Sequence, residues 1–446
     1  MKLLSKMVLL AVCALTAFGR LGAAEPNPSA VFIQRTMKAL TESTAEKPAH
    51  VRVLFYGQSI VAQAWTGMVQ DYLKTTYPTV QFEFSNRAIG GYTSPALIRT
   101  AESDLYPYYP DLLFFHVYGP IDKYEEIVRR VRERTSAEVI LWTSHLSAEQ
   151  DPRAMLDERD QRSKDILAVA ERQKCMVIDL NQKWCRLLLE NGWKAQELLG
   201  DTIHLKPEGC RYYADFIIEE LVRIPDTDGV PEASGTIREI ALDDACVAKN
   251  ADGSLTLAFD GNRVTAISDG SAPEGTKAEI LLDGQKMSEN ADLWGTTRPS
   301  TGPMWMPAIN LVTHETTPVA EDWTLSALEG SAADGSKILF KVEGSVTGPD
   351  GEGVSTERFV SPSGRVVIEP SDIPLAWQFG YTKKTLLPDF KVTWKNYPLF
   401  TDPYQASAAG TRTVLVQNCA NGPHTLTIRP ESGSVGIAGF VVNTPH

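Results

Sequence analysis

Cysteine is scarce in this chain, with six residues in 446, and no two of them form a Cys-x-x-Cys pair. Cys13 lies in the apolar N-terminal segment, and the other five are Cys175, Cys185, Cys210, Cys246 and Cys419. An odd number cannot all pair internally, and the spacings fit no common metal site. We expect most of them to be buried as small apolar residues, and any single disulfide to join two of Cys175, Cys185 and Cys210.

Basic residues are outnumbered by acidic ones. Lys and Arg total 43 against 56 for Asp and Glu, which gives a formal net charge of -13. Proteins that bind nucleic acid rely on clustered Lys and Arg side chains to neutralise phosphates. The acidic balance therefore argues against a nucleic-acid partner. It leaves the oligomeric state open.

Long apolar runs are absent after the N-terminus. There, Lys2 and Lys6 precede an apolar stretch from Met7 to Phe18, and Gly22-Ala23-Ala24 follows it. This layout is typical of a secretory signal peptide over residues 1–24 that is cleaved near Ala24. A membrane anchor is the alternative, but the run is about 12 residues long and a bilayer span needs roughly 20. We expect no membrane span and a secreted or periplasmic mature protein.

The length of the chain favours two domains, since one core rarely serves so many residues. The first, residues 25–228, alternates β-rich apolar runs with amphipathic segments, a pattern that predicts a parallel five-stranded sheet covered by helices. The expected strands are Val51–Tyr56, Val80–Ser85, Leu112–Val117, Val139–Thr143 and Met176–Leu180. The expected helices are Pro28–Leu40, Ala62–Thr76, Pro95–Ser103, Tyr124–Arg134, Met155–Gln173 and Glu208–Arg223.

The second domain, residues 229–446, begins after a turn-rich junction at 224–229 and alternates apolar and polar residues over short runs. This pattern predicts an all-β jelly roll or β-sandwich. The expected strands are Ser254–Phe259, Arg263–Ile267, Ala278–Leu282, Lys337–Val342, Lys391–Trp394, Thr413–Gln417 and His424–Ile428. Aromatic residues in its Pro- and Gly-rich stretches could stack on sugars, although a packing role is favoured for most. They are Trp294, Trp305, Trp377, Phe379, Tyr381, Tyr397 and Tyr404.

Two short motifs in the first domain carry the chemistry. In Gly57-Gln58-Ser59, a serine follows a buried strand and precedes a helix, which places its hydroxyl at the carboxyl edge of a parallel sheet. Asp201 and His204 lie three residues apart ahead of the last helix of the same domain. A serine becomes a good nucleophile when a histidine accepts its proton and a carboxylate orients that histidine. Each motif alone is also compatible with helix capping.

Taken together, these motifs resemble the SGNH (GDSL-like) hydrolase superfamily, over about residues 50–222. A further block, Asn86 to Ser94, is similar to the family block that carries an oxyanion-hole glycine, here Gly91. The resemblance implies a flavodoxin-like three-layer α/β fold. It implies Ser59, His204 and Asp201 as the catalytic triad, and the backbone N–H groups of Ser59 and Gly91 as oxyanion donors. It implies no metal or organic cofactor.

The chain departs from the family in two places. Pro120 stands where the family has the asparagine that supplies a third oxyanion donor, and proline has no N–H to donate. His116, Tyr118 and His145 come at the ends of the third and fourth strands and are candidates for this polar role. A structural role at a strand end is the alternative for each. Gln58 replaces a common aspartate, and its amide could simply hold the loop.

The Gly57-Gln58-Ser59 sequence is similar to the form found in some carbohydrate O-acetylesterases of this superfamily. The closing strands of the second domain also resemble those of jelly rolls attached to secreted carbohydrate enzymes. We therefore predict a secreted serine esterase that removes acyl groups, chiefly acetyl, from an acylated oligo- or polysaccharide. One alternative is a lipid esterase or thioesterase on the same fold, and another is a catalytically degenerate glycan-binding protein.

Overall fold

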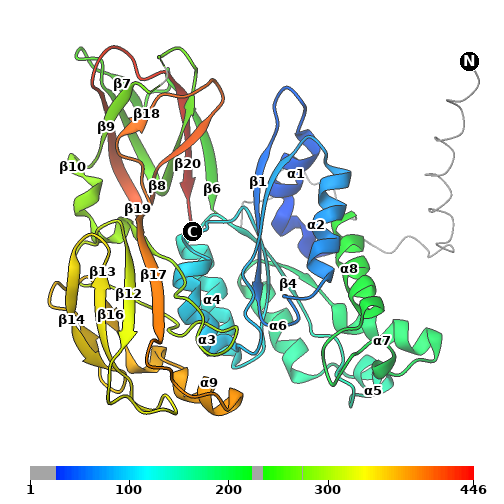
Figure 1. Ribbon diagram of the computed structural model, residues 1–446. Coiled ribbons are helices and arrows are strands. Elements are labelled where there is room, and N and C mark those ends of the chain that lie inside the picture. Colours follow the sequence, from blue (N-terminus) through cyan, green and yellow to red (C-terminus); the bar gives the residue numbers. More distant parts are fainter. Residues whose placement is uncertain (1–26, 223–234, 274) are drawn as a thin grey trace, which may run out of the picture.

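A computed structural model describes residues 27–222, 235–273 and 275–446 of the chain (Figure 1). The proposed signal peptide, its cleavage point near Ala24 and the domain boundary at 228/229 lie outside these residues. In the part that is described, no helix is long and apolar enough to cross a membrane.

The N-terminal half is built on a parallel sheet of five strands in the order β2-β1-β3-β4-β5. Its strands are β1 (His50–Gly57), β2 (Gln81–Asn86), β3 (Leu112–His116), β4 (Glu138–Trp142) and β5 (Met176–Ile178). Every residue of β3 and β4 is buried, as expected for strands covered on both faces. This strand order is the flavodoxin-like one, so the predicted fold class is confirmed.

Helices cover both faces of this sheet, because alternate residues of each strand point to opposite sides (Figure 1). Phe55 and Phe114 face one core, whereas Tyr56 and Phe115 face the other. The first core is covered by η1 (Pro28–Ile33), α1 (Gln34–Glu42), α2 (Trp65–Thr76), α5 (Pro152–Asp157), α7 (Leu180–Asn191) and α8 (Pro207–Val222). The second is covered by α3 (Ser94–Asp104), α4 (Ile121–Arg134) and α6 (Gln161–Arg172).

Two aspartates explain where the helices differ from expectation. The single helix expected over Met155–Gln173 is interrupted, because the Asp160 side chain accepts the N–H of Ser163 at 2.6 Å and starts α6 anew. The strand expected to reach Leu180 ends at Ile178, since Asp179 caps the N-terminus of α7, a helix that was not predicted.

Cys175, Cys185, Cys210 and Cys419 are buried, Cys246 is half-buried, and all five are free thiols. No disulfide therefore joins any two of Cys175, Cys185 and Cys210, the residues among which a single bridge was expected if one formed.

The described part of the C-terminal half is antiparallel and contains two large sheets, each with its own apolar core, and a small two-stranded sheet. The eight-stranded sheet comprises β6 (Thr236–Ala241), β7 (Val247–Lys249), β8 (Leu255–Ser268), β9 (Lys277–Leu282), β10 (Gln285–Lys286), β18 (Tyr404–Gln405), β19 (Arg412–Pro430) and β20 (Ile437–Thr444). The five-stranded sheet comprises β11 (Trp294–Thr296), β12 (Glu321–Ala327), β13 (Leu339–Gly344), β14 (Gly348–Val354) and β17 (Lys391–Pro398). The two-stranded sheet comprises β15 (Phe359–Val360) and β16 (Val367–Ile368), and the C-terminal half also contains the helix α9 (Leu375–Thr382).

Two pairs of expected strands are each one continuous strand. Ser254–Phe259 and Arg263–Ile267 merge into β8, while Thr413–Gln417 and His424–Ile428 merge into β19. The register between β8 and β19 shifts between Gln417 and Gly422, where extra residues bulge out of the ladder without turning the chain.

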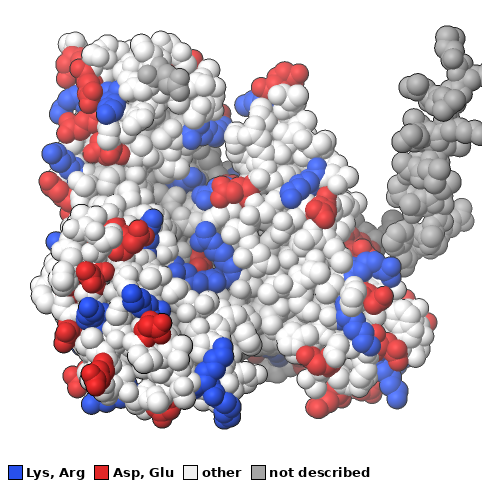
Figure 2. All heavy atoms as spheres, in the orientation of Figure 1, with Lys and Arg blue, Asp and Glu red and all other residues white. Residues whose placement is uncertain are grey.

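The two halves are joined by hydrogen bonds and ion pairs. Arg298 forms a bidentate ion pair with Asp104, with Nη2 2.7 Å from Oδ2, and Arg99 forms a second with Asp372 at 2.6 Å. Both carboxylates are almost fully buried. A charged groove of about 1090 Å³ runs between the β1–β2 edge and the eight-stranded sheet (Figure 2).

We expect Arg298→Ala to lower the free energy of unfolding by about 3 kcal/mol, because it leaves the Asp104 carboxylate buried without its ion-pair partner. Burial already raises the pKa of Asp104. The matched control is Arg358→Ala, which removes an exposed arginine paired with Glu315 and Glu369 and should lower the free energy of unfolding far less, because exposed ion pairs contribute little. Chemical denaturation measures the free energy of unfolding of both variants, and equal decreases in the two would contradict this account.

Candidate active site

Ser59 sits in the tight turn that follows β1, at the carboxyl edge of the parallel sheet. Gly57 permits this turn, since a Cβ there would lie 2.1 Å from the carbonyl oxygen of His116. The Gln58 side chain accepts the N–H of Ile60 at 3.1 Å, and the Trp65 indole donates to the Ile60 carbonyl at 2.6 Å. These two hydrogen bonds stabilise the turn that carries the Ser59 hydroxyl.

A chain of hydrogen bonds links Ser59, His204 and Asp201. His204 Nε2 lies 2.8 Å from Ser59 Oγ, and His204 Nδ1 lies 2.7 Å from Asp201 Oδ2. A carboxylate beside Nδ1 favours the tautomer protonated on that nitrogen, which leaves Nε2 free to accept the serine proton. The structure thus brings together the three residues predicted as a triad, in the geometry that a serine nucleophile requires.

The carboxylate of Asp201 is held in its charged form. The backbone N–H of His204 donates to its Oδ1 at 2.7 Å and that of Ile203 at 2.8 Å, and the imidazole contacts Oδ2. These contacts, the His204 N–H first, lower the pKa of Asp201 to about 2. Asp201, with 55% of its side chain exposed to water, therefore remains ionised at neutral pH.

The loop that carries Asp201 and His204 is fixed by its neighbours. The Gln63 amide pairs with the backbone of Leu205, accepting its N–H at 3.2 Å and donating to its carbonyl at 3.1 Å. His145 Nε2 lies 2.7 Å from the carbonyl oxygen of Ile203. Gln63 was not predicted as a site residue, because a glutamine at the start of a helix carries no distinguishing signal.

Gly91 lies beside the serine and has a φ of +82°, which favours glycine. A Cβ on the preceding Gly90 would lie 3.6 Å from the Ser59 Cβ, so this loop and the serine turn are in contact. Within the described residues, no hydrogen bond uses the N–H of Ser59 or of Gly91. Both groups are therefore free to donate to a ligand, as an oxyanion hole requires.

The loop over residues 87–92, here called the glycine loop, is held from the other side by residues 298–310, here called the clasp. Arg298 Nη2 donates to the Arg87 carbonyl at 2.6 Å, and the Trp305 indole N–H donates to the Gly90 carbonyl at 2.9 Å. Tyr92 Oη donates to Asn310 Oδ1 at 2.5 Å. The C-terminal half therefore helps to build the site.

The other predicted polar residues lie behind the serine turn. His116 is buried, with Nε2 3.0 Å from Ser144 Oγ, Nδ1 3.5 Å from Gln58 Nε2, and its ring stacked on Trp142. Burial lowers its pKa well below the usual value, so the ring is neutral. Tyr118 packs edge-on against His116. Among the described residues, neither side chain hydrogen-bonds to the triad.

Pro120 precedes α4 and is its N-cap residue, and it offers no N–H. Its neighbour Gly119 has a φ of +115° and lies so close to α3 that a Cβ would meet Ser94 Oγ at 2.7 Å. The Ser94 hydroxyl donates to the Pro120 carbonyl at 2.9 Å, which ties this segment to the start of α3. Position 120 therefore supplies no third oxyanion donor.

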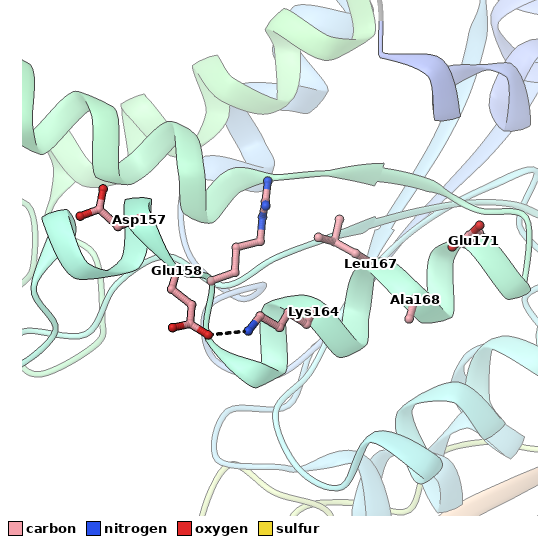
Figure 3. Close-up of a pocket in the computed structure, with 7 residues that line it drawn as sticks. Asp157, Glu158, Lys164, Leu167, Ala168 and Glu171 are labelled. Atoms are coloured by element: carbon pink, nitrogen blue, oxygen red, sulfur yellow. Dashed lines mark hydrogen bonds and ion pairs between the residues drawn. The ribbon is translucent and has the colours of Figure 1, made fainter.

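Away from the triad, the described residues hold no cluster of metal ligands, and one hollow is lined by charged side chains. No group of three or more His, Cys, Asp or Glu in that part of the chain could hold a metal ion. A hollow over α5 and α6 is lined by charged residues that include Glu158 and Lys164, paired at 3.0 Å (Figure 3). None of the triad residues lines it.

Comparison with known proteins gives structural resemblances alone. No family model matches the chain, and no curated protein matches its sequence. A two-domain esterase (CEX) active on acetylated mannans is similar at a TM-score of 0.37 and 13% identity, over 93% of this chain and 96% of that one. The acetyl xylan esterase AlAXEase gives 0.33 and 22%, over 38% and 98%. Axe2, an acetylxylan esterase from Geobacillus stearothermophilus, gives 0.33 and 21%, over 39% and 95%.

The environment of His145 predicts a pH effect on stability. Burial lowers the pKa of its imidazole from 6.5 to about 4, and the nearby His204 adds to this shift. A histidine with a depressed folded-state pKa contributes stability that is complete above 6.5 and is lost as the pH falls towards 4. The free energy of unfolding should therefore fall by about 2–3 kcal/mol between pH 7 and 4.5 on account of His145 alone.

The control is His145→Gln, which retains an N–H donor for the Ile203 carbonyl but does not titrate. Chemical denaturation at pH 7 and at pH 4.5 gives the free energy of unfolding of each protein. Its decrease between the two pH values should be about 2–3 kcal/mol larger in the wild type than in the variant. His116 is present in both proteins, so its contribution cancels. Identical decreases would show that His145 is not buried in its neutral form.

Proposed function

We propose that this chain is a serine esterase that removes acyl groups, chiefly acetyl, from a glycan, with Ser59, His204 and Asp201 as its triad. The observation that carries the proposal is the continuous hydrogen-bonded chain from Ser59 Oγ through the His204 imidazole to the Asp201 carboxylate. The free N–H groups beside it and the braced turns that hold it support the same reaction.

In the proposed reaction, Ser59 Oγ attacks the ester carbonyl carbon as His204 Nε2 takes the hydroxyl proton. The carbonyl oxygen becomes an oxyanion that accepts from the N–H groups of Ser59 and Gly91. His204 then returns the proton to the leaving sugar oxygen as the C–O bond breaks, and an acyl-serine remains. Water, activated by His204, releases the carboxylic acid and restores the serine. Asp201, ionised throughout, orients His204 and stabilises its charged form.

The exposure of the triad supports a hydrophilic substrate. The side chains of His204 and Asp201 are 41% and 55% exposed, so the site opens directly to solvent. A lipid esterase needs an enclosed apolar channel for the acyl chain. An open site instead accommodates a bulky, hydrated alcohol such as a polysaccharide. The signal peptide predicted over residues 1–24 would export such an enzyme and give it access to extracellular glycans.

We expect Ser59→Ala to lower kcat for 4-nitrophenyl acetate by about 10⁴-fold or more, because the acyl-enzyme can no longer form. A fluorophosphonate should label the wild type in a one-to-one ratio and leave the variant unlabelled. Ser371→Ala, which changes an exposed serine in η5 (Pro370–Asp372), is the matched control and should keep full activity and labelling. Full activity in Ser59→Ala would refute the mechanism.

The acyl group and the alcohol are tested with two substrate series. Among 4-nitrophenyl esters, kcat/KM should be highest for acetyl and should fall at least about tenfold by octanoyl, since the open site offers a long chain little apolar contact. Acetate release from chemically acetylated mannan and xylan, followed by chromatography, tests the glycan. A preference for octanoyl would favour a lipid esterase, whereas glycan binding without acetate release would favour a degenerate binding protein.

A further inference from the structure

We propose that Trp305 is the sugar-binding surface of the site, and that its exposed indole face stacks on the pyranose ring whose ester Ser59 attacks. The proposal rests on the proposed esterase function and names the residue that recognises the alcohol part of the substrate. It also gives the C-terminal half a direct role in substrate selection.

Trp305 is exposed although its polar atom is already engaged. The side chain is 61% exposed, while its indole N–H donates to the Gly90 carbonyl at 2.9 Å. Solvation of the N–H therefore does not explain why this large apolar ring lies at the surface. An exposed aromatic held in place beside reactive groups is typical of a ligand-binding surface.

The indole lies next to the nucleophile. A Cβ built on Gly90 would lie 3.1 Å from Trp305 Nε1 and 3.6 Å from the Ser59 Cβ, so both side chains border the same point of the glycine loop. When the ester carbonyl sits at Ser59 and its oxygen points to the N–H of Gly91, the alcohol must leave across the neighbouring surface. Trp305 borders this surface.

The loop that carries Trp305 is held by packing and by hydrogen bonds. Its neighbours Met304 and Met306 are 8% and 1% exposed and pack into the core of the α/β half, which leaves the residue between them facing outward. Gly302 N–H donates to the Met306 carbonyl at 3.0 Å and closes the loop. The Gln378 amide of α9 donates to the Pro307 carbonyl at 2.8 Å. Little conformational freedom remains to be lost when a ligand binds.

A sugar ring fits this surface chemically. The face of a pyranose ring presents several C–H groups that pack flat on an indole, while its hydroxyls stay in water around the rim. An acyl chain gains little from one open aromatic face, because a lipid site surrounds its ligand. The geometry therefore points to a carbohydrate alcohol.

The test compares two acetyl esters that differ in the alcohol, namely a methyl pyranoside monoacetate and vinyl acetate, which has no ring. For Trp305→Ala we expect kcat/KM for the glycoside ester to fall about tenfold more than that for vinyl acetate, chiefly through KM. Trp305→Phe loses the N–H to Gly90 but retains an aromatic face. The ratio of kcat/KM for the glycoside ester to kcat/KM for vinyl acetate should therefore stay near the wild-type ratio in this variant. Trp377→Ala changes another exposed tryptophan, on α9, and should leave both values unchanged.

Equal losses on the two esters in Trp305→Ala would overturn the proposal and assign Trp305 a structural role in holding the glycine loop. Unchanged kcat/KM values for both esters in Trp305→Ala would overturn it as well. Circular dichroism of each variant establishes that it is folded. Failure of the esterase proposal is separate, since the wild type would then hydrolyse neither ester.

Discussion

The amide of Gln63 joins the two turns on which the site depends. Ser59 and His204 are separated by 145 residues, yet their reactive atoms lie 2.8 Å apart. Gln63, four residues after Ser59, pairs through both amide atoms with the backbone of Leu205, next to His204. A displacement of either turn would break this pair as well as the hydrogen bond of the triad. The serine and the imidazole are therefore set in register by their neighbours before any substrate arrives.

The second constraint comes from the C-terminal half. The clasp contacts the glycine loop at Arg87, Gly90 and Tyr92, and two ion pairs with buried carboxylates join the two halves nearby. The N–H of Gly91 can serve a developing negative charge only if that loop keeps its shape, because a preorganised donor needs no rearrangement during the reaction. In the proposed function, catalysis and substrate recognition would therefore share one interface.

Much of the α/β half could be predicted because its signals are local. Continuous apolar runs such as Leu112–His116 mark buried strands, and the short motifs around Ser59 and His204 gave the residues that the structure brings together. The break before α6 and the start of α7 depend on single capping aspartates, which periodicity does not show. Gln63 could not be predicted as a site residue, because its role arises from a contact with a residue 142 positions away. Trp305 was one of seven aromatic residues that could stack on sugars, and only its contact with Gly90, 215 positions away, distinguishes it from the others.

The position of the clasp in the chain has a consequence for biosynthesis. The last strand of the parallel sheet ends at Ile178 and the triad is complete at His204, whereas the clasp begins almost a hundred residues later. Domains fold as units from the N-terminus while the chain is being made. The nascent α/β half thus emerges with its glycine loop still unsupported, and it gains that support only when the later sheets fold against it. Maturation of the site is in this way coupled to completion of the polypeptide.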